Sequence, residues 1–407
     1  MAPADTDPAA EIAGLTIRWY GFMRYAQRMT NLGTETAFEV LARARRLEAQ
    51  GRRIVHLEIG EPDFDTPRNI KDAAIQALNN GYTHYGPSAG LPDLREAAAE
   101  YIATDRGVTV DPAQVIVTPG AKPIIFFTAL SLLDEGDEVI YPNPGFPIYE
   151  SMIDFVGAKR VPLKLDEERG FAFDPDDLSR LVTERTKLVV INSPQNPTGG
   201  VLPQDVLDRL AKLAIENDFY VLADEIYSQI IYEGTHRSIY AIDGMPERTI
   251  ILEGHSKAYA MTGWRLGYGI MPREMAAKVA KLMTNSNSCT CSFTQMAGVE
   301  ALRGPQDSVA EMVREFRARR DLIVEGLNGI AGVRCHRPAG AFYVFPNITG
   351  TGRTSKEMEN FLMEEAGVAV LAGTSFGEFG EGYIRLSYAN SQDNIRLALE
   401  QMASVLS

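Results

Sequence analysis

Residues 254–267, GHSKAYAMTGWRLG, say more about the fold than any other stretch of the sequence. They follow a short apolar run at residues 249–252, which is typical of a buried strand. Lys257 comes soon after this run, where burial would lower the pKa of a lysine and favour its neutral, nucleophilic amine. Arg265 carries a planar guanidinium that suits a phosphate group. The alternative interpretation is that Lys257 is an exposed lysine on a surface loop.

Further apolar, β-branched runs precede this stretch and alternate with helical segments. Continuous apolar runs flanked by helices indicate parallel strands that are covered on both faces, so the sequence predicts an α/β fold. In such a sheet the ligand crevice lies beyond the carboxyl ends of the strands. The runs lie at residues 115–117, 138–141, 188–191 and 220–223.

The remaining elements indicate a second, smaller α/β domain. After about residue 303 a long charged helix leads to two strand-rich segments, AGAFYVFPNI and EGYIRLSYAN, with a helix between them. We expect a strand at residues 54–59 and helices at residues 36–50, 68–79, 91–102, 123–133 and 308–327. The N-terminal helix is expected to join the smaller domain, since chain ends often pack together. The predicted divisions are a disordered N-terminus at residues 1–20, a large domain at residues 63–300, and a small domain at residues 21–62 and 301–407.

Three more candidate sites follow predicted strands. The glycine turn TPGAK at residues 118–122 enters a helix, whose N–H groups and positive dipole end suit a phosphate, although an ordinary strand–helix turn is the alternative. In INSPQNPTGG, residues 191–200, the amide of Asn196 can donate to a phenolate oxygen, although a plain Asn-Pro turn also fits. Asp224 ends a very apolar strand, where a carboxylate needs a positive charge unless it caps a helix.

Composition and charge exclude several classes of function. The formal net charge of −14 argues against a basic surface that would bind nucleic acid or an anionic membrane. The three cysteines lack a CxxC pair, which argues against a disulfide framework and against a zinc site, so no metal is expected. The N-terminus lacks a basic segment followed by an apolar one, and no apolar run is long enough to span a bilayer. A cytoplasmic protein is expected.

Taken together, these stretches resemble the aspartate aminotransferase family, the fold-type-I pyridoxal-phosphate enzymes. The resemblance covers roughly residues 57–388 and rests on motifs in the family order, which are GEPDFDTP, HYGPSAGLPDLR, SPxNPTG, DEIY, SK…TGWRLGY and YIRLSYA. It implies a large domain with a mostly parallel seven-stranded sheet between helices, pyridoxal 5′-phosphate as the cofactor, and a homodimer with shared active sites. One departure is His255, where the family usually carries an apolar or small residue, and we expect this histidine to affect packing only.

The resemblance also implies a role for each matching residue. Lys257 would form the Schiff base with the cofactor aldehyde and move the proton at the substrate Cα, and Asp224 would pair with the pyridinium nitrogen. Tyr227 and Asn196 would hydrogen-bond the ring oxygen, and Phe146 would stack on the ring. The cofactor phosphate would be held by Gly120, Ala121, Ser256 and Arg265, and by Tyr85 of the neighbouring subunit.

The substrate side is less constrained by the sequence. The resemblance implies that Arg385, with Gly60 and Asn196, binds the substrate carboxylate, but strand alternation also allows Arg385 to face solvent. Lys122 stands in the opening turn of a helix, where a cation is disfavoured, so we expect an anion beside it. That anion is either the cofactor phosphate or the distal carboxylate of a dicarboxylic substrate such as aspartate or glutamate.

The expected activity is transfer of an amino group between an L-amino acid and a 2-oxo acid. A related cofactor enzyme that catalyses elimination, decarboxylation or synthase chemistry on an amino acid is the alternative. A non-catalytic sensor is a third hypothesis. Such sensors are usually fused to a DNA-binding segment, and the first 30 residues are too short and not basic enough to form one. The sequence does not identify the amino donor.

Overall fold

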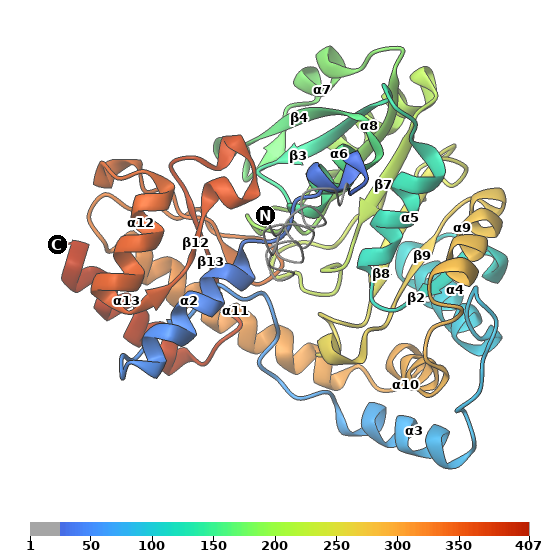
Figure 1. Ribbon diagram of the computed structural model, residues 1–407, viewed down its shortest axis with the longest axis horizontal. Coiled ribbons are helices and arrows are strands. Elements are labelled where there is room, and N and C mark those ends of the chain that lie inside the picture. Colours follow the sequence, from blue (N-terminus) through green and yellow to red (C-terminus); the bar gives the residue numbers. More distant parts are fainter. Residues whose placement is uncertain (1–24, 407) are drawn as a thin grey trace, which may run out of the picture.

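The centre of the molecule is an eight-stranded sheet with the strand order β2-β9-β8-β7-β6-β3-β4-β5 (Figure 1). The computed structural model describes residues 25–406, so the disorder predicted for residues 1–20 lies outside the described residues. Neighbouring strands from β8 to β4 pair in parallel, whereas β9 is antiparallel to both β2 and β8, and β5 is antiparallel to β4. The strands are β2 (Val115–Thr118), β3 (Glu138–Asn143), β4 (Lys159–Asp166), β5 (Ala172–Phe173), β6 (Thr186–Asn192), β7 (Tyr220–Asp224), β8 (Thr249–Gly254) and β9 (Gly267–Ile270).

The mostly parallel sheet agrees with the α/β prediction, but the sheet has eight strands where seven were expected. The additional strand is β5, a two-residue edge strand that is too short to show strand periodicity in the sequence. Each of the five apolar runs lies within a strand of this sheet. Strands β4 and β9 were not anticipated, because β4 is partly exposed and β9 contains two glycines.

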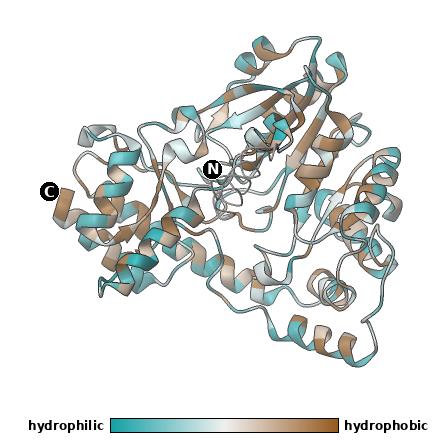
Figure 2. Cartoon of the chain, viewed as in Figure 1, coloured by the Kyte–Doolittle hydropathy of each residue, from teal (hydrophilic) through white to brown (hydrophobic). Residues whose placement is uncertain are grey.

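Helices cover both faces of the sheet, as alternate strand residues show. Val189 and Val221 pack with α8 on one face, whereas Val190 and Leu222 pack with α5, α6 and α9 on the other. Strands β6 and β7 are therefore hydrophobic on both faces, and Figure 2 shows brown, apolar stretches within the central sheet. The helices around the sheet are α3 (Arg68–Asn79), α4 (Pro92–Arg106), α5 (Lys122–Leu132), α6 (Ile148–Val156), α7 (Pro175–Leu181), α8 (Gln204–Asn217), α9 (Arg273–Ser286) and α10 (Ser292–Arg303).

The C-terminal elements gather on one side of the molecule together with α2 (Ala37–Ala49) (Figure 1). They form a three-stranded sheet, β10-β13-β12, and a two-stranded sheet in which β1 pairs in parallel with β11. The predicted strand at residues 54–59 was too long, because only Val55 and His56 of β1 (Val55–His56) pair in register with residues of β11. The other elements are β10 (Tyr343–Val344), β11 (Val368–Ala369), β12 (Leu371–Ala372), β13 (Ile384–Ser387), α11 (Asp307–Asn328), α12 (Ser355–Phe361), the π-helical turn η7 (Leu362–Ala366) and α13 (Gln392–Leu406).

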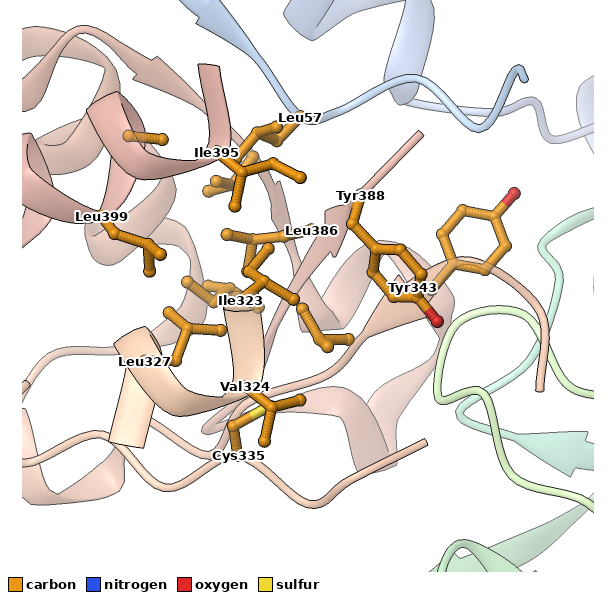
Figure 3. Close-up of a cluster of buried hydrophobic side chains, with 14 of the residues drawn as sticks. Leu57, Ile323, Val324, Leu327, Cys335, Tyr343, Leu386, Tyr388, Ile395 and Leu399 are labelled. Carbon is orange, nitrogen blue, oxygen red and sulfur yellow. The ribbon is translucent and has the colours of Figure 1, made fainter. Parts of the chain in front are cut away.

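A separate hydrophobic core joins these C-terminal elements (Figure 3). Leu327 of α11, Leu386 of β13 and Ile395 of α13 are fully or almost fully buried in it. Tyr343 belongs to the same core, and its hydroxyl extends toward the edge of the central sheet. The domain boundaries proposed from the sequence stay a prediction. None of the helices in residues 25–406 is long and apolar enough to cross a membrane.

Candidate functional site

A cavity of about 370 Å³ lies at the carboxyl edge of the central sheet. Its walls combine Asn192 and Asp224, at the ends of β6 and β7, with Tyr343 of β10 and Arg385 of β13. Most of the site residues predicted from the sequence line this one cavity, namely Gly60, Ala121, Lys122, Phe146, Asn196, Asp224, Tyr227, Ser256, Lys257, Arg265 and Arg385. Of the other two, Gly120 adjoins the cavity through Arg265, and Tyr85 does not line it.

Lys257 follows β8 and points its amine at the loop after β1. Its Nζ donates a hydrogen bond to the carbonyl oxygen of Gly60 at 2.6 Å, and the side chain is partly buried rather than free on a surface loop. Burial lowers the pKa of Lys257 to about 8, against the opposing charges of Glu61 and Glu35. At pH 8 about half of such amines are neutral, compared with less than about 1% for an unperturbed lysine. The amine is therefore available as a nucleophile or base near neutral pH.

Asp224 is the last residue of β7 and is buried at the cavity wall. One carboxylate oxygen accepts a hydrogen bond from the Tyr149 hydroxyl at 2.6 Å, and the other accepts one from the backbone N–H of Ile226. Burial raises the pKa of Asp224 to about 6, although both hydrogen bonds act against the increase. Residues 226–229 form a turn, so Asp224 does not cap a helix. Within residues 25–406 the carboxylate forms no ion pair, which leaves room for a cationic group from a ligand.

Gly120 and Arg265 form a second polar corner of the cavity. Gly120 has φ +86°, and a Cβ atom there would lie 2.1 Å from the Arg265 guanidinium, so only glycine fits beside this arginine. Nη1 of Arg265 donates to the carbonyl of Thr262 at 2.8 Å. Helix α5 begins just after Ala121 without a side-chain cap, so its positive end faces the same corner. A guanidinium and an uncapped helix N-terminus are the donor set that a phosphate requires.

Asn196 and Tyr227 also line the cavity. The Oδ1 atom of Asn196 accepts a hydrogen bond from Arg385, which leaves its amide N–H groups for a ligand. The Tyr227 hydroxyl is 2.8 Å from the Tyr343 hydroxyl, and Tyr227 is buried with its ring edge-on to Phe342 and Tyr343. Burial raises the pKa of Tyr227 well above its usual range, so this hydroxyl acts as a neutral donor.

Arg385 is buried, so the solvent-facing alternative for this strand residue is wrong. Its guanidinium donates to Asn196 at 3.3 Å and to the carbonyl of Glu58, and its Nε atom is buried without a partner among the described residues. The rings of Tyr343 and Phe376 flank the cation at 4.7 and 5.0 Å. Burial lowers the pKa of Arg385, which still leaves a strong cation aimed into the cavity. Such a group is suited to binding a carboxylate.

Lys122 has a partner that the sequence did not reveal. Its ammonium forms an ion pair with Glu35, which precedes α2, and lies 5.4 Å from the centre of the Phe146 ring. Glu35 also lines the cavity. The anion expected beside Lys122 is therefore present in the protein itself.

Tyr85 does not meet the other predicted residues within this chain. Its side chain is 90% exposed in the loop between α3 and α4. An exposed tyrosine of this kind is available to a second copy of the chain, and its role in a shared site stays a prediction.

Several residues of the site were not predicted from the sequence. Tyr149, which donates to Asp224, stands one helical turn after Phe146, and that spacing is the one signal from which it could have been inferred. Asn192 lies within the INSPQNPTGG stretch and Tyr343 within AGAFYVFPNI, but no pattern singled out either residue. His255 is buried and packs against Tyr259 and Tyr268, and burial lowers its pKa to about 4, so it is a neutral packing residue as expected.

A buried ionic network supports the strand ends behind the cavity. Arg106 donates to Glu225, which follows Asp224, at 2.9 Å, and to Glu253 of β8 at 2.8 Å. All three side chains are almost completely buried. The network therefore ties the end of β7, which carries Asp224, to the end of β8, which Lys257 follows.

Replacing Arg106 with methionine is expected to lower the free energy of unfolding by about 3–5 kcal/mol, because it removes the arginine that the buried carboxylates of Glu225 and Glu253 share. Urea unfolding followed by circular dichroism measures this loss. Arg303→Met, which breaks an exposed ion pair with Glu100, is the matched control and should cost less than about 1 kcal/mol. Equal losses in the two variants would show that the buried network contributes no more to the free energy of unfolding than an exposed ion pair does.

The chain is similar to known aminotransferases over almost its full length. The family model described as aminotransferase class I and II matches residues 52–402. The aspartate/prephenate aminotransferase of Thermus thermophilus is 44% identical over 384 residues, covering 94% of this chain and 98% of that protein. Aromatic-amino-acid aminotransferase 2 of Thermococcus litoralis is 41% identical over 363 residues, covering 88% and 93%. The structure of the Thermus thermophilus aspartate aminotransferase with maleate superposes with a TM-score of 0.91 at 41% identity, covering 95% of this chain and 100% of that one.

Proposed function

The chain belongs to the class I and II aminotransferases, and from this premise we propose that it binds pyridoxal 5′-phosphate at Lys257 and transfers amino groups between an L-amino acid and a 2-oxo acid. The observation that carries the proposal is the pairing of two unusual groups in one cavity. Lys257 has an amine whose pKa is about 8, and Asp224 is a buried carboxylate without an ionic partner among the described residues. Pyridoxal phosphate carries an aldehyde, which can react with the Lys257 amine. Its ring nitrogen can carry a proton and pair with the Asp224 carboxylate.

The other lining residues fit the same cofactor. Arg265, Ser256 and the start of α5 beside Gly120 would hold the phosphate, and the ring of Phe146 would pack on the ring of the cofactor. Asn196 and Tyr227 would donate to the ring oxygen, while Asp224 would keep a proton on the ring nitrogen. Tyr149 would orient that carboxylate through its 2.6 Å hydrogen bond.

When bound, pyridoxal phosphate supplies an electron sink that makes the Cα–H bond of an amino acid acidic. Arg385 would bind the substrate α-carboxylate, with Asn196 and the backbone at Gly60 beside it. The substrate Cα would then face Lys257, whose amine would remove the proton from that carbon and deliver it to the cofactor carbon that receives the amino group. The names of the relatives suggest dicarboxylic and aromatic amino acids as candidate donors.

The test is a half-reaction with the purified holoenzyme. A single amino acid in the absence of a 2-oxo acid should convert the bound cofactor to its amine form in a stoichiometric amount, and a 2-oxo acid should reverse the absorbance change. A panel of donors scored in this way would also rank the substrates. Release of ammonia or carbon dioxide in place of this reversible change would identify elimination or decarboxylation chemistry, and no change with any donor would favour a sensor.

The proposal includes a homodimer in which Tyr85 of one subunit reaches the phosphate of the other. Mixing Lys257→Ala subunits with Tyr85→Phe subunits should therefore create heterodimers with one intact site. With random mixing about a quarter of all sites would be intact, and activity should exceed that of either parent. Activity that stays at the average of the parents after subunit exchange would contradict the shared site. The cytoplasmic location stays a prediction.

A further inference from the structure

The segment before α2 brings a carboxylate over the cavity. Glu35, Ala37 and Phe38 all line it, although they are more than 200 residues from Lys257 in the sequence. Glu35 also lines a small adjoining pocket together with Phe146 and Arg385. Its negative charge is within electrostatic reach of the reacting amine, because it acts with Glu61 against the burial that lowers the pKa of Lys257. Glu35 is therefore part of the site rather than a remote surface residue.

Glu35 neutralises the one lysine of the cavity other than Lys257. Lys122 begins α5, where the helix dipole disfavours a cation, and its side chain leans over the ring of Phe146. The ion pair with Glu35 offsets the unfavourable interaction between the Lys122 ammonium and the positive end of the helix dipole. A ligand carboxylate that approached Lys122 would have to displace Glu35 or lie beside its charge, and both cost free energy.

Apolar side chains also line the cavity, namely Ile59, Phe38, Ile125 and Phe146. Phe146 lies against Lys122, and Phe38, three residues after Glu35, is exposed. With Lys122 already paired, a side chain without charge can pack against this apolar surface. An aromatic or long apolar side chain would bury that surface without breaking an ion pair.

We propose that Glu35 is a specificity-determining residue, which by occupying Lys122 makes the site favour uncharged apolar or aromatic side chains and disfavour a second carboxylate. The inference rests on the proposed function, since it assumes that Arg385 binds the α-carboxylate and that the side chain lies toward Lys122. It answers the question that the sequence left open about Lys122. Among the described residues, the anion beside the Lys122 ammonium is Glu35.

The first test compares donors on the variant Glu35→Gln. Removing the charge frees Lys122, so kcat/KM for aspartate and glutamate should rise about tenfold to a hundredfold, the factor expected for one charge-assisted hydrogen bond. Values for phenylalanine and leucine should change less than about threefold. Glu39→Gln, which removes an exposed charge from the same helix outside the cavity, is the control and should change neither class of donor.

The second test asks whether the gain depends on Lys122. In the double variant Glu35→Gln/Lys122→Ala the increase for dicarboxylic donors should disappear, whereas Lys122→Ala alone should not raise dicarboxylate activity, because it leaves the Glu35 charge in the cavity. A gain that survives in the double variant would overturn the proposal. A Glu35→Gln variant with unchanged or uniformly reduced activity on all donors would also overturn it, since Glu35 would then serve only to hold α2 in place.

A binding measurement separates this inference from the proposed function, because it requires no turnover. Calorimetric titration of the holoenzyme with succinate and with 3-phenylpropionate gives two dissociation constants. Glu35→Gln should lower the dissociation constant for succinate about tenfold or more and leave the dissociation constant for 3-phenylpropionate unchanged. Equal effects on the two ligands would overturn the role of Glu35 while leaving the proposed function intact. If the wild-type protein also failed the half-reaction with every donor, the proposed function itself would be wrong.

Discussion

Replacing Lys257 with alanine is expected to lower turnover by several orders of magnitude while the protein still binds the cofactor. The cofactor would keep its contacts with Asp224, Arg265 and Phe146, so affinity should persist. The amine that would hold the cofactor covalently and move the substrate proton would be absent, and no other lysine amine replaces it, because Lys122 is paired with Glu35. Steady-state kinetics and cofactor titration measure the two quantities separately.

Lys281→Ala is the matched control for this experiment, since Lys281 is an exposed lysine on α9. It should retain wild-type turnover. A Lys257→Ala variant with substantial activity would contradict the assignment, and a variant that lost both folding and cofactor binding would indicate a structural role for the lysine. Among residues 25–406, the substitution removes one hydrogen bond, from Nζ to Gly60, so the fold should survive.

Replacing Arg385 with alanine is expected to have the second largest effect. Truncating one member of a buried charge pair costs about 2–5 kcal/mol, which corresponds to a loss of roughly 30-fold to several thousand-fold in kcat/KM for amino acids. Simple amines, which lack the α-carboxylate, should lose much less. The half-reaction with both kinds of substrate measures the difference.

The control for Arg385 is Arg396→Ala, which removes an exposed arginine from α13. It should leave both classes of substrate unaffected. Equal losses for amino acids and simple amines in Arg385→Ala would mean that Arg385 only holds Asn196 and the Glu58 carbonyl in place. That outcome would also weaken the assumption on which the role of Glu35 depends.

The sequence predicted those parts of the structure that local patterns control. Helix α3 has the bounds expected from its periodicity, and the apolar runs became strands because their residues pack on both faces of one sheet. Asp224 and Lys257 were found because a charged residue after a buried strand is costly unless it has a chemical role. The seven-strand count failed at β5, since a two-residue edge strand has no period to detect.

Long-range pairing accounts for what the sequence did not predict. Glu35 carries no motif, and its meeting with Lys122 depends on how the segment before α2 crosses the cavity. Tyr343 reaches Tyr227 only because the C-terminal core places β10 beside the edge of the central sheet. Arg385 could be assigned to a strand from alternation, but only the packing of β13 against the rest of the protein decides which face is buried.

Covalent mapping of the cofactor tests the central claim most directly. Borohydride reduction of the holoenzyme should fix the cofactor irreversibly to one lysine through a stable secondary amine, and digestion followed by mass spectrometry identifies that residue. The account predicts a single labelled peptide that contains Lys257, with one cofactor per chain. Label on another lysine, or a cofactor that remains removable after reduction, would contradict it.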